Sequence, residues 1–222
     1  MKEILAQKKN RAAEILKRLY GHYPNPKGSL SYSSAHELLV ATILSAQCTD
    51  KRVNLITPTL FEKYTSPNDF ANADIAELAK DIHSCGYHNQ KARSIIACSQ
   101  MIVNDFNGDV PDSLESLIKL PGVGRKTANC VLGQWFGIPA MVIDTHMIRI
   151  MNVLELTQSE SPNVIEKEMM ELFEPMDWVS LTHMIIAHGR AVCVARRPDC
   201  QNCFLLDMCP FPQRNNSYKT QK

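Results

Sequence analysis

Residues 120–129, Leu120-Pro121-Gly122-Val123-Gly124-Arg125-Lys126-Thr127-Ala128-Asn129, lie between one helical pattern that ends near Lys119 and another that runs to Phe136. The stretch predicts a helix, a tight hairpin and a second helix. Gly122 and Gly124 permit backbone conformations that other residues avoid, and they leave no side chain to keep a phosphate from the amides. With the start of the second helix, these amides predict an anion site.

The residues around the two glycines add to this interpretation. A Pro-Gly pair alone is more typical of an ordinary turn between helices. Leu120 and Val123, however, are suited to anchor the hairpin in a core, while Arg125 and Lys126 follow where a positive charge can face a phosphate. The stretch therefore favours contact with a nucleic-acid backbone.

The rest of the chain predicts helices almost everywhere. Apolar residues recur at helical spacing, and Ser34 precedes Glu37 by three residues, as in a capping box. About nine or ten helices joined by short loops are expected, so the favoured fold class is all-α. Residues 138–143 are the one strand-like run, and Pro58 is expected to kink its helix or to end it one residue earlier.

Composition sets only broad limits. The 222 residues are 45% hydrophobic and 21% charged, which is typical of a globular protein. A net charge of +1 neither supports nor excludes a DNA partner. No apolar run has the length of a membrane span, and charges interrupt the first twenty residues, so a cytoplasmic protein without a targeting signal is expected.

Four of the eight cysteines are close together, in a C-x6-C-x2-C-x5-C pattern formed by Cys193, Cys200, Cys203 and Cys209. Four thiolates at such short spacing indicate a metal centre, either tetrahedral zinc or a [4Fe–4S] cluster. Nearby arginines, Arg190, Arg196 and Arg197, could contact phosphates or form a solvated charge run. The other four cysteines stand at apolar helical positions and are assigned no chemistry: Cys48, Cys85, Cys98 and Cys130.

Two Gly- and Pro-containing stretches, 21–28 and 137–139, are where a domain boundary could fall. We therefore expect a helical domain at 28–137, and a discontinuous second domain from 1–27 plus 138–222.

The hairpin motif resembles the helix–hairpin–helix of the endonuclease III family of DNA glycosylases. Residues 44–50, Leu-Ser-Ala-Gln-Cys-Thr-Asp, resemble that family's Leu-Ser-Ala-Gln-x-Thr-Asp motif, and the cysteine spacing resembles its cluster loop. The resemblance runs from about Ser33 to Cys209. It implies a two-domain fold with a DNA-binding cleft between a helical bundle domain and a terminal [4Fe–4S] domain, and it favours that cluster over zinc.

The same resemblance implies the site residues. Lys126 matches the catalytic nucleophile, which forms a Schiff base with the opened sugar, and Asp144 matches the essential aspartate. Since a free lysine is mostly protonated near neutrality, the site is expected to favour the neutral amine. Gln47 matches the glutamine that inserts into the duplex, although Asp50 beside it could simply cap a helix. Tyr87 stands where the family often has a bulky apolar wedge, and it could equally pack between helices.

The resemblance implies a bifunctional DNA N-glycosylase and AP lyase of base excision repair, which removes oxidised or damaged pyrimidines and cuts the strand 3′ to the abasic site by β-elimination. The expected partner is duplex DNA with damaged bases or abasic sites. The protein is expected to act as a monomer away from membranes, at the nucleoid if prokaryotic.

Three alternatives remain open at this point. A monofunctional adenine or thymine mismatch glycosylase would share the hairpin and the cluster, but such relatives usually lack the lysine. A non-catalytic helix–hairpin–helix module would leave Asp144 and the Gln47 loop unexplained, and a zinc-stabilised interaction domain would have no lesion-dependent affinity for DNA. The two candidate catalytic residues also have ordinary interpretations: Lys126 as a solvated surface charge and Asp144 as a helix N-cap.

Overall fold

The computed structural model describes residues 3–214 of the chain. Within this range all regular elements are helices, which confirms the predicted all-α class. The strand-like pattern at 138–143 is not borne out. These residues form a loop, because the described range contains no strand that could pair with them. None of the helices in this range combines the length and apolar composition that a membrane crossing requires.

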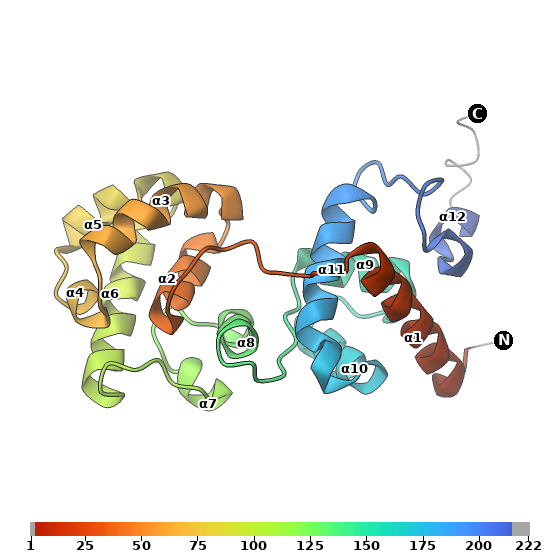
Figure 1. Cartoon of the computed structure of the whole chain (residues 1–222), viewed down its shortest axis with the longest axis horizontal. Helices are drawn as coiled ribbons and strands as arrows, with labels where there is room; N and C mark the ends of the chain where they lie inside the picture. Colours follow the sequence, from red (N-terminus) through yellow and green to blue (C-terminus); the bar gives the residue numbers. More distant parts are fainter. Residues whose placement is uncertain (1–2, 215–222) are drawn as a thin grey trace. The chain divides into compact units, whose positions relative to one another are not determined.

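The helices fall into two compact units, which share no element (Figure 1). We call the first, Gly28–Ile138, the hairpin unit and the second, which combines Met1–Lys27 with Pro139–Lys222, the terminal unit. The expected boundary lay after residue 137, whereas the units change after Ile138. Residues 1–2 and 215–222 of the expected second domain lie outside the described residues. The assignment of separate roles to the two parts stays a prediction.

The hairpin unit contains seven α-helices and one 3-10 helix. They are α2 (Ala35–Ser45), α3 (Asp50–Lys63), α4 (Pro67–Ala71), α5 (Ile75–Asp81), η1 (His83–Cys85), α6 (His88–Asp105), α7 (Leu114–Leu117) and α8 (Arg125–Gln134).

The terminal unit contains the first helix and the helices after residue 144. They are α1 (Leu5–His22), α9 (Thr145–Val153), α10 (Pro162–Leu172), η2 (Pro175–Asp177), α11 (Trp178–Ala191), η3 (Leu206–Met208) and α12 (Phe211–Arg214). The predicted number of nine or ten helices was too low, because α4, α7 and α12 are too short for an apolar period to reveal.

Helix α2 is the central helix of the hairpin unit. Its residues 38–44 are all buried, and α3, α6 and α8 pack around it. A helix that is apolar on all sides requires neighbours on all sides, which explains the position of α2. Its one buried ionisable group, His36, has Nε2 2.9 Å from Oγ of Ser99 on α6. Burial lowers the pKa of His36 from 6.5 to about 4, so the ring is neutral near pH 7.

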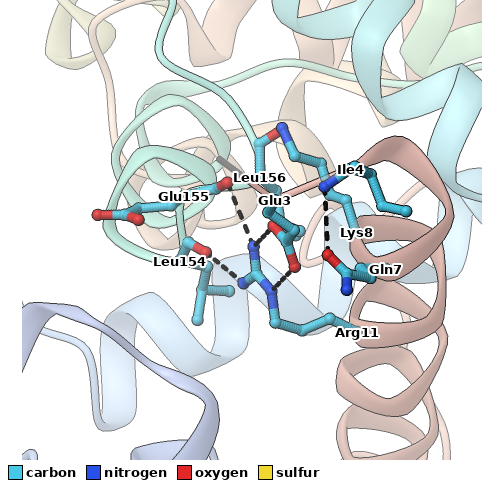
Figure 2. Close-up of polar contacts among 8 residues, drawn as sticks. All are labelled: Glu3, Ile4, Gln7, Lys8, Arg11, Leu154, Glu155 and Leu156. Atoms are coloured by element: carbon cyan, nitrogen blue, oxygen red, sulfur yellow. Dashed lines mark hydrogen bonds and ion pairs between the residues drawn. The ribbon is translucent and has the colours of Figure 1, made fainter. Parts of the chain in front are cut away.

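Helix α1 is held in the terminal unit by a buried face and by an arginine. Ala12, Ile15 and Leu19 form the buried face, and α10 and α11 pack against the helix. Arg11 donates to the carbonyls of Leu154 at 2.6 Å and Glu155 at 3.3 Å, at the end of α9 (Figure 2). A cation stabilises this end because the last carbonyls of a helix lack helical partners. These contacts explain how the N-terminal helix belongs to the same unit as helices from the second half of the chain.

Two local predictions are revised by the structure. Ser34 caps α2 by accepting from the Glu37 amide at 3.1 Å, but the Glu37 carboxylate accepts from Ser33 instead of completing a capping box. Pro58 does not end its helix, since α3 continues to Lys63. Leu60, which follows the proline, is buried like Val53 before it, and this packing stabilises the helix on both sides of the missing hydrogen bond.

The neutral, buried His36 predicts a pH-dependent stability. Because its pKa is lowered on folding, the unfolded chain takes up a proton that the folded chain does not, so stability falls as pH drops from 6.5 towards 4. Between pH 7 and pH 5 we expect a loss of about 2 kcal/mol from this residue. Urea unfolding of the protein and of His36→Gln at both pH values measures it. The other histidines are common to both proteins, so an equal pH dependence in the two would contradict the prediction.

Candidate functional site

The hairpin between α7 and α8 is anchored as the sequence predicts. Leu120 and Val123 are 2% and 6% exposed, so both apolar residues are in the core of the hairpin unit. Gly122 has φ +78°, and a Cβ there would lie 2.6 Å from Cβ of Ser94, so both the conformation and the close approach to α6 require glycine.

Gly124 needs a different explanation. Its φ is −90°, which other residues also adopt, so Gly124, unlike Gly122, does not use the conformational freedom of glycine. A Cβ at this position would meet nothing within 4 Å. Gly124 is the N-cap of α8 and makes no side-chain capping bond. What glycine provides here is open space in front of the first turn of a helix, where a phosphate can approach the amides.

Arg125 and Lys126 are the first two residues of α8, and both are exposed. Cys130 lies one turn further along the helix, where burial raises the pKa of its thiol and the charge of Lys126 opposes that rise. Five of the predicted site residues thus lie together in positions 122–126, and one of them, Lys126, is at a helix N-terminus. This position lets a primary amine and an anion-binding backbone act on the same strand of a nucleic acid.

Asp144 lies in the terminal unit, where it is the N-cap of α9. Its Oδ1 accepts from the Met147 amide at 2.8 Å, so the interpretation as a helix cap is confirmed. The carboxylate is half-buried, with one oxygen engaged in the cap. A carboxylate so placed has a fixed orientation, which any direct role in chemistry would also require.

Gln47 is exposed in the loop between α2 and α3, with a left-handed φ of +53°. The suggestion that Asp50 caps α3 is wrong, because Thr49 is the N-cap and accepts from the Arg52 amide at 3.3 Å. Asp50 is instead the first residue of the helix. The loop therefore presents the glutamine side chain to solvent.

Tyr87 is the N-cap of α6 and is 67% exposed. The alternative in which this tyrosine packs between helices is therefore wrong. Its φ of +49° follows the φ of +70° at Gly86, so two consecutive residues have left-handed φ values. An exposed aromatic side chain on so sharp a turn is available to stack against a base.

A residue that the sequence did not single out connects these two loops. Lys91, on α6, is only 5% exposed, and its Nζ donates to the carbonyl of Leu44 at 2.8 Å and of Cys85 at 2.9 Å. Lysine is rarely buried. Nothing in the local sequence marks it, because a lysine in an amphipathic helix normally lies on the solvated face.

The four clustered cysteines line one cavity of about 180 Å³ in the terminal unit. A single water needs only about 10–15 Å³, so the space is that of a polyatomic group. Apolar side chains from α9 and from 205–212 complete the lining, among them Ile150, Leu205 and Phe211. Within residues 3–214, no group of three or more potential ligands is arranged to hold a single metal ion. The soft thiolate set and the cavity volume both fit an iron–sulfur cluster.

Neighbouring helices hold the cysteines in place. Arg149 of α9 donates from Nη1 to the carbonyl of Cys193 at 2.5 Å and lies 3.5 Å from its Sγ. Nε2 of His188, on α11, is 3.7 Å from Sγ of Cys203. Hydrogen bonds to ligand sulfurs stabilise and tune such a centre.

Helix α1 also reaches this segment. Arg18 donates to the carbonyl of Phe204 at 3.1 Å and pairs with Asp207 at 2.6 Å, between the third and fourth cysteines. No local pattern predicts these contacts of Arg18, or those made by Arg149 and His188.

Burial raises the pKa of all four thiols, and that of Cys209 to about 11. Cysteine binds a metal as the thiolate, so a bound cation would have to offset this preference for the protonated thiols. None of the eight cysteines, all of which lie within residues 3–214, forms a disulfide, and this includes the four outside the cluster, Cys48, Cys85, Cys98 and Cys130. Arg190, Arg196 and Arg197, close to Cys193 in the sequence, are exposed.

Two family models match the chain. Residues 40–175 match a model described as the HhH-GPD superfamily base excision DNA repair protein. Residues 193–209, which begin and end on predicted ligands, match the iron–sulfur binding domain of endonuclease III. The chain accordingly carries the [4Fe–4S] cluster of that family, held by the cysteine segment.

Full-length relatives agree. The endonuclease III of Synechocystis is 48% identical over 94% of this chain and 96% of its own, and that of Escherichia coli K12 is 35% identical over 93% and 98%. A solved structure of a trapped endonuclease III–DNA covalent intermediate superposes with a TM-score of 0.89 at 38% identity, over 92% of this chain and 97% of that one. These matches cover more than nine-tenths of the sequence and include both the hairpin and the cysteine segment. The chain belongs to the endonuclease III family.

Proposed function

We propose that this protein is a bifunctional DNA N-glycosylase and AP lyase of base excision repair, which excises oxidised or damaged pyrimidines from duplex DNA. The observation that carries the proposal is the exposed Lys126 in the first turn of α8, directly after a hairpin with open backbone at Gly124. Any cation at this point could bind a phosphate, whereas a primary amine can also form an imine with the opened sugar. The related endonuclease III that was trapped as a covalent intermediate with DNA supports a covalent reaction here as well.

In the proposed reaction Nζ of Lys126 attacks C1′ of the damaged nucleotide, and the bond from C1′ to the base breaks with its electron pair leaving on the base. One proton of the amine goes to the departing base. The other goes to the ring oxygen as the bond from C1′ to that oxygen breaks, which opens the sugar and gives an imine between Lys126 and C1′. Loss of a proton from C2′ then expels the 3′ phosphate by β-elimination, and water releases the lysine. An amine is required because neither a hydroxyl nor water can form the imine.

Asp144 is proposed to stabilise the positive charge that develops on the sugar or to assist proton transfer. Its bond to the Met147 amide engages one carboxylate oxygen, which leaves the second available for that role. Of the two residues proposed for the chemistry, Lys126 belongs to the hairpin unit and Asp144 to the terminal unit.

The proposed partner is duplex DNA that contains a damaged base or an abasic site. The amides of Gly122, Val123 and Gly124, together with Arg125, would bind the backbone, and Gln47 and Tyr87 would fill the space left by the extruded nucleotide. Exposure of both side chains supports this. We propose that the protein acts as a monomer in the cytoplasm and, in a prokaryote, at the nucleoid, where its DNA substrate is.

Cys193, Cys200, Cys203 and Cys209 are proposed as the ligands of the [4Fe–4S] cluster. When bound, the cluster supplies four strong bonds that fix the segment 193–209 in a region with little regular structure. This would hold Arg196 and Arg197, which lie between the first two ligands, in position to meet phosphates.

The first prediction concerns Lys126. Lys126→Ala is expected to abolish the adduct that borohydride traps with DNA containing thymine glycol or an abasic site, because no imine forms without the amine. DNA binding should remain detectable, since the hairpin backbone is intact. Lys80→Ala, at an exposed lysine of α5, is the matched control and should trap like the unmodified protein. Base release without trapping by the unmodified protein would instead indicate a monofunctional glycosylase.

The second prediction separates the two roles of Asp144. Asparagine is as good an N-cap as aspartate, so Asp144→Asn should leave the melting temperature nearly unchanged, whereas Asp144→Ala should cost about 1 kcal/mol. Both variants lose the carboxylate, and excision of thymine glycol should fall about 100-fold or more in each. If the asparagine variant excises at the normal rate, Asp144 is a cap and has no part in the chemistry.

The third prediction concerns the cluster. The purified protein should be brown, with broad absorption at about 400 nm from iron–sulfur charge transfer. Cys209→Ala should lose most of this absorption and iron, because the buried ligand is removed, while Cys98→Ala, a buried free thiol of α6, should retain both. A colourless protein with one zinc per chain would overturn the assignment.

A further inference from the structure

Lys91 is the one buried lysine in the described part of the chain, and its ammonium lies between the two loops that carry Gln47 and Tyr87. Its Nζ donates to the carbonyl of Leu44, in the last turn of α2, at 2.8 Å. The same atom donates at 2.9 Å to the carbonyl of Cys85, the last residue of η1. One cation therefore joins the ends of two helices, at carbonyls that are 41 residues apart in the sequence.

Both carbonyls need such a partner. The last carbonyls of a helix have no amide within the helix to bond, and they lie at the negative end of its dipole. At the end of α2 the Cys48 amide bonds to the carbonyl of Ser45, so it does not serve Leu44. A lysine ammonium supplies both the hydrogen bond and the positive charge.

The chain turns sharply directly after each of these carbonyls. Gln47, three residues beyond Leu44, has φ +53°, and Tyr87, two residues beyond Cys85, has φ +49°. Left-handed conformations are uncommon for residues other than glycine, and they persist where surrounding contacts hold them. The Lys91 amide also bonds to the carbonyl of Tyr87 at 3.0 Å, so Lys91 contacts the backbone on both sides of Gly86.

Burying a lysine has a cost that the protein could avoid. Burial lowers the pKa of Lys91, and the nearby thiols Cys85 and Cys48 oppose that shift. A simple apolar residue at this position of α6 would cover the same surface without a buried charge, but it could not bond two carbonyls. The position of this charge therefore favours a role in loop geometry over one in packing.

We infer that Lys91 is a positioning residue for DNA insertion: its ammonium holds the Gln47 loop and the Tyr87 loop at a fixed spacing, so that both exposed side chains meet the same duplex. The inference rests on the proposed function, in which these two side chains fill the space left by an extruded nucleotide. It adds a residue that touches no DNA and acts through the two loops.

The test is a double-mutant cycle on DNA insertion. The probe is a duplex with 2-aminopurine opposite a tetrahydrofuran abasic analogue, whose fluorescence rises when the opposite base is unstacked. Lys91→Met should weaken the fluorescence-detected affinity about tenfold, because without the ammonium the two loops lose the fixed spacing that binding must then restore. In the Gln47→Ala, Tyr87→Ala background the same substitution should have almost no further effect on affinity, while it lowers the melting temperature equally in both backgrounds.

Lys80→Met, at an exposed lysine of α5, is the matched control and should bind like the unmodified protein. Lys91→Gln keeps two N–H donors without the charge, and it replaces the Met variant in the cycle if that variant does not fold. Equal losses of affinity in both backgrounds would overturn the inference, because Lys91 would then act independently of the loops. Normal affinity of the Lys91 variants would overturn it as well.

The inference and the proposed function can fail separately. If Gln47→Ala and Tyr87→Ala bind and cut like the unmodified protein, the positioning role is wrong while the glycosylase and lyase activity stands. If the unmodified protein neither cuts lesion-containing DNA nor forms a borohydride-trapped adduct, the proposed activity itself is wrong.

Discussion

Every helix leaves amides without helical partners in its first turn and carbonyls without partners in its last, and most of the proposed functional residues lie at or just beyond these ends. Lys126 is in the first turn of α8, Asp144 is the N-cap of α9, and Tyr87 is the N-cap of α6. The unpaired backbone groups can bind a ligand, be capped by a side chain or be capped by a buried charge. A fold made of many short helices therefore offers many sites of this kind, and the interior helices, above all α2, hold the ends in place.

The iron–sulfur segment depends on residues that are far away in the sequence. Residues 192–210 contain one short 3-10 helix and otherwise turns and loops, so they cannot bury enough apolar surface to fold alone. Arg18 from α1, Arg149 from α9 and His188 from α11 each contact this segment. The terminal unit thus forms a cavity lined by the four clustered cysteines, and burial raises the pKa of their thiols. A cluster bound there would supply the positive charge that favours the thiolates.

In the hairpin unit, the N-terminus of α8 and the C-terminus of α2 have different functions. The N-terminus of α8 is left without a side-chain cap and is open at Gly124, which suits an incoming phosphate. The C-terminus of α2 is instead closed by the ammonium of Lys91, which suits a loop whose geometry must not change when DNA arrives. The same electrostatic rule thus serves binding in one place and rigidity in the other.

Local patterns were enough for the all-α class, for the buried anchors Leu120 and Val123, and for the cysteine segment, because helical periodicity, turn residues and ligand spacing act over a few neighbouring positions. They failed where distant segments compete. Pro58 remains inside α3 because packing outweighs one lost hydrogen bond, and 138–143 is no strand because it has no neighbour. They also missed Lys91, Arg149 and His188, whose partners lie 47, 44 and 15 residues away. Which charged side chain is buried, and against which carbonyl or sulfur, is decided only when the helices pack, because only then are water and the alternative partners excluded.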